Sequence, residues 1–343
     1  MAKTNDTKEP GSRPTIIDVA REAGVSKSLV SLVLQGEPSV SEVRRKAVEK
    51  AIKKLNYRPN FAARHLASQR TRSIGVIITE YRNLSYVNVI EGLRAIFDAA
   101  GYQVIISDLH HSPKLAKDPV DAFRSMNVDA LVFIAEAAGL HTTDLDVPSV
   151  TVGFRETRVS GTDLVFSDDA VGTRMLVRHL YELGHRKIAH LTGLGGIAKN
   201  RRDAFVREMT KLRLRADVFG TEQPTSEIGG FNGAKEMLAS GNHFTAIFAA
   251  NDYMAAGAIS ALAEAGLRVP EDISIVGYDN APIAGDYLLK LTTIDDMGVE
   301  IGEAVATQIL KRLDEPAAAS GKSAKILLQP TMVVRGSTSQ LKS

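Results

Sequence analysis

The sequence predicts a small all-α head joined to an α/β body made of parallel sheets. In residues 15–60, short stretches with apolar residues at helical spacing follow one another, separated by a glycine turn and capping residues. Beyond residue 72, short apolar runs alternate with helical stretches, which is typical of parallel strands covered by helices on both faces. The junctions Gly101-Tyr102 and Gly184-His185 repeat one helix-ending pattern, so the body is predicted to contain two similar lobes.

Length and composition set the class of protein. A chain of 343 residues is long enough for two or three domains with sizeable cores. It contains no cysteine, which excludes disulfides and thiolate metal sites. No apolar run approaches about 18 residues, and the polar segment 1–13 lacks the apolar stretch of a secretory signal. We therefore expect a cytoplasmic protein with no membrane partner and a disordered lead-in.

The first helix of the head begins at a capping box. Thr15 is followed three residues later by Asp18, so each side chain can accept a hydrogen bond from the other residue's backbone amide. Val19, Ala20 and Ala23 then share one face, and Gly24 supplies the sharp turn that ends the helix.

Two further helices complete the head. Ser26 is expected to cap a helix over Lys27–Leu34, and Ser41 is expected to cap a third helix. The positions predicted to face the core are Val30, Val33, Leu34, Ala47, Val48, Ala51, Ile52 and Leu55. Two short helices joined by a glycine turn form a helix-turn-helix, whose second helix enters the major groove of DNA.

Charge favours this interpretation over a small helical bundle with no role on nucleic acid. Residues 13–72 contain 13 Lys/Arg and 5 Asp/Glu, a net charge of +8. The first twelve residues balance to zero and the whole chain carries +2, so residues 73–343 must sum to −6. A basic head on an acidic body is expected when a DNA-binding module is joined to another function.

In the body, one helix is predicted over 87–100, ended by Gly101. The runs predicted to form strands are 74–78, 104–107, 130–134, 149–152, 188–191, 246–249 and 273–276.

Residues 15–70 resemble the head and hinge of the lactose-repressor (LacI/GalR) family of bacterial transcription regulators. The matching segments are TIIDVAREAGVSKSLVSLVLQGEPSV in the head and YRPNFAARHLA in the hinge. The resemblance continues through VPSVTVGF, HLYELGHRKIAHLTG, IFAANDYMAAGAISALAEAGLRVPEDISIVGYDN, LTTID and MVVRGST, and covers roughly residues 14–338. It implies a helix-turn-helix domain, a hinge helix and a two-lobed effector domain of doubly wound parallel sheets, similar to periplasmic binding proteins.

The resemblance also implies domain boundaries, with crossovers between the lobes near residues 170, 295 and 328. The lead-in is 1–13, the helix-turn-helix domain 14–60, and the hinge helix and linker 61–72. The N-terminal lobe comprises 73–170 with 296–327, and the C-terminal lobe 171–295 with 328–338.

By this resemblance, the first two residues of the recognition helix, Lys27 and Ser28, contact base edges. Lysine can donate to guanine O6 and N7, so Lys27 is the better candidate for specificity; the alternative is that it contacts only phosphate. Leu32 stands where relatives commonly have arginine, which removes a guanine contact and leaves an apolar contact with a thymine methyl. The implied DNA-contacting residues are Thr15, Ser26, Lys27, Ser28, Ser31, Leu32, Gln35, Tyr57, Asn60, Ala63 and Leu66.

The hinge is expected to form a short helix from a cap at Asn60 to about Ser68. Ala63 is small enough to let the helix approach that of a second subunit, and the resemblance implies that Leu66 wedges into a base step from the minor groove. The alternative is that Leu66 is an ordinary linker residue. Because an isolated helix of this length is marginal in water, we expect it to fold only on DNA.

The resemblance places an effector between the lobes, where the carboxyl ends of strands meet. Arginine donates in a fork, asparagine both donates and accepts, and carboxylates accept from hydroxyls. This mixture suits a neutral polyhydroxylated ligand, such as a sugar or a cyclitol like inositol. The predicted effector-binding residues are Arg201, Asn251, Asp279 and Asp296, with Tyr86 and Phe166 as apolar walls.

One side of the predicted pocket departs from the family. Glu80-Tyr81-Arg82-Asn83-Leu84-Ser85-Tyr86 stands where many relatives have Asp-x-x-Asn-Pro-Phe-Phe. Arg82 makes a phosphorylated sugar or another acidic metabolite the alternative effector. The pair Asp168-Asp169 is interpreted as structural.

Enzyme functions are not favoured. The loop Gly193-Leu194-Gly195-Gly196 lacks the third spaced glycine of a dinucleotide site and there is no P-loop, so it is interpreted as a cleft loop. The histidines lack metal-ligand spacing, and no nucleophile–base array is visible. We therefore expect no catalytic residue, metal or cofactor. The alternative function, a sugar-binding or sugar-processing protein that does not bind DNA, would not explain the helix-turn-helix head.

The sequence therefore predicts a ligand-responsive transcription regulator that binds a pseudo-palindromic operator as a homodimer. The sign of the response, the effector and the choice between dimer and tetramer stay open.

Overall fold

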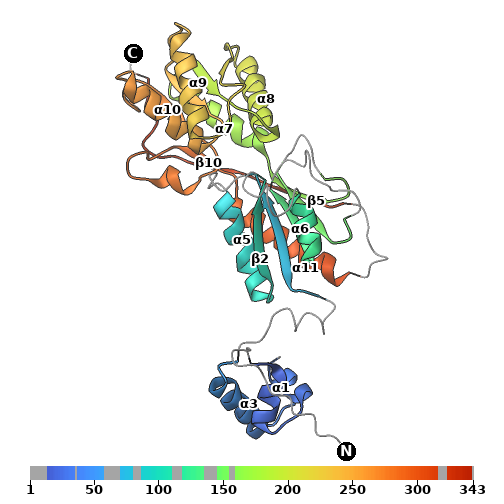
Figure 1. The fold of residues 1–343 in the computed structure, drawn as a ribbon. Coiled ribbons are helices and arrows are strands. Elements are labelled where there is room, and N and C mark those ends of the chain that lie inside the picture. The colour runs from blue at the N-terminus through green and yellow to red at the C-terminus, as the bar shows by residue number, and fades with distance from the viewer. Residues whose placement is uncertain are drawn as a thin grey trace, which may run out of the picture. The chain divides into compact units, whose positions relative to one another are not determined.

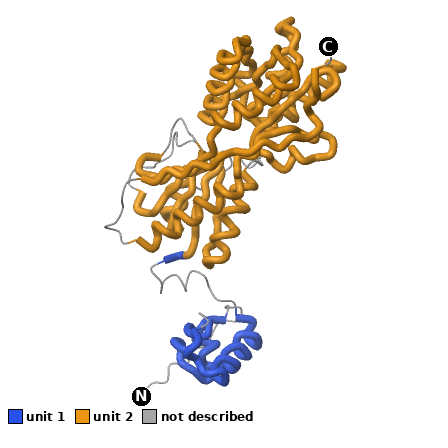
Figure 2. Tube along the Cα trace, turned by 180° about the vertical axis from the view of Figure 1, so that it is seen from behind, with its two compact units in different colours: residues 1–71 blue, residues 72–343 orange. Residues whose placement is uncertain are grey.

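The computed structural model describes residues 14–34, 37–57, 70–79, 86–109, 118–134, 145–153, 159–315 and 323–341. The chain divides into two compact units, residues 1–71 and 72–343 (Figure 2). None of the helices in these ranges combines the length and apolar character needed to cross a membrane.

The described part of the first unit contains helices α1 (Ile16–Ala23), α2 (Lys27–Leu34) and α3 (Glu42–Lys54). Val19, Val30 and Val48 are fully buried at their centre. The predicted capping box is present, since Thr15 and Asp18 each accept from the other's backbone amide. Gly24 takes a left-handed conformation at φ 67°, which the turn requires and which glycine adopts without strain.

One capping prediction was wrong. Ser41 precedes α3, but its side chain makes no capping hydrogen bond. The first turn has Glu42 instead, a negative charge at the positive end of the helix dipole.

The N-terminal lobe is a six-stranded sheet in the order β11-β5-β4-β3-β1-β2, in which every pair is parallel (Figure 1). Its strands are β1 (Ser73–Ile78), β2 (Gln103–Asp108), β3 (Ala130–Ile134), β4 (Ser149–Val152), β5 (Asp163–Ser167) and β11 (Lys325–Leu328). Helices α5 (Tyr86–Ala99) and α11 (Gly298–Asp314) pack on one face and α6 (Pro119–Ser125) on the other.

Alternation along β1 explains why both faces are covered. Ile74, Val76 and Ile78 belong to the core beneath α5 and α11. Ile77, between them, belongs to the core beneath α6. The strand is apolar throughout because successive side chains point to opposite, equally buried faces.

The C-terminal lobe is a four-stranded parallel sheet in the order β7-β6-β8-β9. Its strands are β6 (Ile188–Leu191), β7 (Asp217–Phe219), β8 (Ala246–Ala249) and β9 (Ser274–Val276). Helices α7 (Asp169–Glu182) and α8 (Gly196–Lys211) pack on one face, and α9 (Glu227–Ala239) and α10 (Asp252–Glu264) on the other. A short 3-10 helix, η1 (Pro282–Gly285), follows β9.

The chain passes between the two sheets at three places in the described ranges. It leaves the first sheet after β5, returns between β10 (Thr293–Asp295) and α11, and leaves again between β11 and β12 (Thr331–Val333). Strands β10 and β12 pair antiparallel to each other. These passages fall between residues 167 and 169, between 295 and 298, and between 328 and 331.

Candidate functional site

A cavity of about 190 Å³ lies between the two lobes. The N-terminal lobe contributes Thr79, Tyr86, Ile134 and Val152 to its lining, together with Ser167 at the end of β5. The C-terminal lobe contributes the side chains of Arg201, Asn251 and Asp279 and the start of α8. Strand ends of two doubly wound sheets therefore meet where a ligand is expected.

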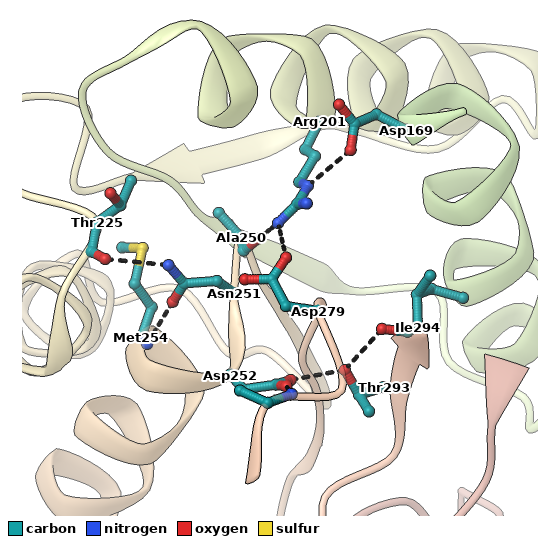
Figure 3. A network of polar contacts seen from close by, with 11 residues as sticks. Asp169, Arg201, Thr225, Ala250, Asn251, Asp252, Met254, Asp279, Thr293 and Ile294 are labelled. Atoms are coloured by element: carbon teal, nitrogen blue, oxygen red, sulfur yellow. Dashed lines mark hydrogen bonds and ion pairs between the residues drawn. The ribbon is translucent and has the colours of Figure 1, made fainter. Parts of the chain in front are cut away.

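Arg201, from α8, is at the centre of the polar wall (Figure 3). Its Nε lies 3.0 Å from Asp169 Oδ1 and its Nη1 lies 2.8 Å from Asp279 Oδ1. Nη1 also donates to the carbonyl of Ala250 at 2.7 Å, and the guanidinium lies over the Tyr278 ring at 3.6 Å from its centroid. With a side chain only 5% exposed, this arginine is held rigidly by two carboxylates and an aromatic face.

Asn251 links the pocket to the start of α10. Its Oδ1 caps the helix by accepting from Met254 N at 2.8 Å, and its Nδ2 donates to the Thr225 carbonyl at 3.0 Å (Figure 3). An amide group has two N–H donors, so the second hydrogen on Nδ2 can serve a ligand while the first fixes the side chain.

Two further carboxylates line the cavity. Asp279 is 8% exposed and has a left-handed backbone at φ 98°. Burial, with the charge of Asp279 nearby, raises the pKa of Asp296 well above its usual range. A carboxylate accepts hydrogen bonds from hydroxyl groups, and its protonated form also donates one.

The structure brings five of the six predicted effector residues to the cavity: Tyr86, Arg201, Asn251, Asp279 and Asp296. Phe166 does not line it, although we expected it to form an apolar wall. The next residue of β5, Ser167, lines the cavity instead, because successive side chains of a strand point to opposite faces. Arg82 lies outside the described residues.

Sequence reasoning missed the role of Asp169. Asp168 is structural as predicted, since its Oδ1 caps α7 by accepting from Ala170 N and Val171 N. Asp169, however, lines the cavity and forms the ion pair with Arg201. The available signal in the sequence was its position two residues after the end of β5, at the edge of the sheet that faces the cleft. The loop Leu194-Gly195-Gly196 also lines the cavity, and Gly195 precedes α8 at φ 100°.

In the head, the start of α2 presents the predicted DNA-contacting side chains. Lys27 and Ser28 are exposed, Leu32 is 38% exposed and Ser31 is half-buried. Ser26 Oγ accepts from Leu29 N at 3.2 Å, which fixes the start of the helix. Tyr57 packs against the core and Thr15 is exposed within its capping box. Gln35, Asn60, Ala63 and Leu66 lie outside the described residues.

Both units of the chain match known protein families. Residues 15–60 match the model for bacterial regulatory proteins of the lacI family, and residues 177–338 match a periplasmic binding protein-like domain. The chain is 32% identical over 337 residues to the HTH-type transcriptional repressor PurR of Erwinia tasmaniensis, covering 94% of this chain and 96% of that protein. It is 28% identical over 334 residues to the ribose operon repressor of Haemophilus influenzae, covering 96% and 99%.

Solved structures of transcriptional regulators are also similar to this chain. A Lac repressor structure with bound ONPG is 29% identical with a TM-score of 0.81, covering 95% of this chain and 100% of that chain. A LacI-family regulator from Corynebacterium glutamicum is 34% identical with a TM-score of 0.70, covering 79% and 100%.

Proposed function

The chain belongs to the LacI family of bacterial regulatory proteins, and we propose that a neutral polyhydroxylated ligand, a sugar or a cyclitol such as inositol, binds between its lobes and sets its affinity for DNA. It is a DNA-binding transcriptional repressor with a helix-turn-helix domain and a ligand-binding domain. Its operator is pseudo-palindromic and is bound by a homodimer, as one half-site matches one recognition helix. A Lac repressor dimer bound to operator, 29% identical, supports this assembly.

The ion pairs of Arg201 are the main support for a neutral ligand. Among the described residues that line the cavity, Arg201 is the only cation, and Asp169 and Asp279 already hold it. Asp296 adds a third carboxyl group. Among the described lining residues, a phosphorylated ligand would meet more acid groups than cations, whereas hydroxyl groups find both acceptors and donors there.

A thermal-shift screen of the purified protein tests the ligand class. The panel contains neutral sugars and cyclitols, sugar phosphates, and nucleobases as an unrelated class. A ligand at a hundred times its Kd raises stability by about 2.7 kcal/mol if it binds only the folded state, which a melting curve resolves. We expect hits among the neutral polyols. Hits confined to sugar phosphates would contradict the neutral ligand class.

We expect Asp279→Asn to weaken binding of the polyol found in that screen about 10- to 100-fold. The substitution keeps the shape and tolerates the left-handed backbone, but it removes a charged acceptor whose hydrogen bonds contribute about 1.5–3 kcal/mol. Isothermal titration measures the loss, with Glu271→Gln, an exposed acid of the same lobe, as control. An unchanged Kd in Asp279→Asn would remove this residue from the site.

The role of Lys27 is tested on the operator obtained by in vitro selection from random duplexes. We expect Lys27→Ala to lower specific affinity by about 1–3 kcal/mol and to relax the preference at one base pair, as loss of a base contact does. Fluorescence anisotropy over a salt series measures it, with Lys50→Ala on the exposed face of α3 as control. An equal loss on every sequence would assign Lys27 to phosphate.

A further inference from the structure

Two successive residues at the edge of the cavity have left-handed backbones. Asp279 has φ 98° and Asn280 has φ 47°, although neither is glycine. Such conformations are strained for residues that have a side chain, and they persist where surrounding contacts enforce them. Asp279 is enforced by Arg201. Asn280 does not line the cavity, so its contacts need a separate explanation.

The polar groups of Asn280 bind three different segments of the chain. Its Oδ1 accepts from Arg335 Nη2 at 2.8 Å, just beyond β12. Its Nδ2 donates to Asp295 Oδ2 at 2.9 Å, at the end of β10. Its backbone carbonyl accepts from Asn88 Nδ2 at 3.3 Å, and Asn88 belongs to α5 of the N-terminal lobe.

Two of these segments lie beside passages between the lobes. Strands β10 and β12 pair with each other and adjoin the second and third crossovers. Asn280 therefore binds Asp295 at the second crossover and Arg335 just beyond the end of the strand that follows the third. Asp295 also accepts from Met297 N at 2.8 Å, immediately before α11 enters the N-terminal lobe. A β-carbon at Gly298 would lie 2.8 Å from Cβ of Asn88, so α5 and the start of α11 are in tight contact here.

The neighbouring residue is fixed independently of Asn280. Ala281 N donates to Asp252 Oδ2 at 2.7 Å, and Thr293 Oγ1 of β10 donates to Asp252 Oδ1 at 2.6 Å (Figure 3). The turn and β10 are therefore both tied to Asp252 of α10 by hydrogen bonds that do not involve Asn280.

We propose that Asn280 is a positioning residue that couples the ligand site to the arrangement of the lobes, by tying the turn that bears Asp279 to the second crossover at Asp295, to Arg335 beyond β12 and to α5. Ligand contact at Asp279 changes this turn, and Asn280 passes the change to the N-terminal lobe. The part of this inference that concerns ligand rests on the proposed function; the connection between the lobes does not.

Hydrogen exchange of the full chain, measured by mass spectrometry without ligand, tests the connection. Asn280→Gly removes the side-chain hydrogen bonds to Arg335 and Asp295, which hold in place the backbone carbonyl that accepts from Asn88, but it suits the left-handed backbone. We expect at least tenfold faster exchange in residues 89–95 of α5 and 298–302 of α11, with β6 and β8 within twofold of wild type. Asn127→Gly, at another left-handed and exposed asparagine (φ 51°), is the matched control and leaves both segments unchanged.

Faster exchange confined to residues 277–283 would make Asn280 a local turn residue and overturn the proposal. A uniform rise that includes β6 and β8 would overturn it as well, since that reports global destabilisation.

A second measurement uses myo-inositol and D-ribose as probes. In wild type, a bound probe should slow exchange in residues 89–95. Asn280→Gly should still bind it, with Kd raised less than tenfold, but residues 89–95 should no longer respond. An undiminished response would contradict the proposal. If neither probe binds wild type, the proposed ligand class loses support, while the exchange of the unliganded variants still decides the role of Asn280.

Discussion

Arg201→Met should lower the free energy of unfolding by about 3–5 kcal/mol and abolish effector binding. Methionine replaces the buried aliphatic stem but leaves Asp169 and Asp279 without their cation. Breaking a buried ion pair from one side is costly because the remaining charges stay buried and uncompensated. Urea unfolding at neutral pH measures the loss of stability, and calorimetric titration with the screened polyol measures the loss of binding.

Two comparisons separate this charge effect from lost packing. Arg207→Met, at an exposed arginine of the same helix, should change stability by less than about 0.5 kcal/mol. The double variant Arg201→Met with Asp279→Asn should be more stable than Arg201→Met alone, since one uncompensated charge is removed. If the double variant is as unstable as the single one, packing and not charge accounts for the loss.

His190 should make the C-terminal lobe sensitive to acid. The side chain is fully buried in β6, where its ring stacks on Phe205 and Phe248 with centroids 5.0 and 4.5 Å away. Its Nδ1 is 2.9 Å from the Phe248 carbonyl, to which the neutral ring donates, and its Nε2 has no partner among the described residues. Burial lowers the pKa of His190 to about 3.

His190 lowers the stability of the fold as the pH falls, because the unfolded chain takes up a proton at this histidine before the folded chain does. Below pH 6.5 the unfolded chain protonates this histidine, whereas the folded chain does not until about pH 3. At 1.36 kcal/mol per pH unit, His190 alone removes roughly 4–5 kcal/mol of stability between these values. Burial acts in the opposite sense on Asp252 and Asp296, whose raised pKa values favour the fold at low pH. The effect of His190 is therefore isolated by comparing wild type with a variant at this position.

We expect the stability of His190→Phe to fall less steeply than that of wild type from pH 6.5 to 4, by up to about 1.4 kcal/mol per pH unit. The ring stack is kept and the titrating group is removed, while a lost hydrogen bond to Phe248 lowers stability equally at every pH. Urea midpoints measured across the range give the slope. His243→Phe, at an exposed histidine, is the control. Parallel slopes for wild type and His190→Phe would contradict this prediction.

Sequence alone determined much of the local structure, and five of the six residues it predicted for the effector line the cavity. Helices α1 and α2 were predicted because capping at Thr15 and Ser26 and the turn at Gly24 are interactions between near neighbours. Strands β1, β3 and β8 were predicted because both of their faces are buried, which leaves an uninterrupted apolar run. Strands β7 and β10 were missed because each includes an aspartate, so neither forms an uninterrupted apolar run.

Tertiary structure decided what depends on residues far apart in the chain. It selected Ser167 over Phe166 for the cavity, because the direction in which β5 presents its side chains depends on how the sheet sits against the other lobe. It brought Asp169 to Arg201, 32 residues away, and Asn280 to Asn88, 192 residues away. Capping and periodicity act over a few residues and can be read from the chain, whereas an ion pair across a cleft exists only once both lobes have folded.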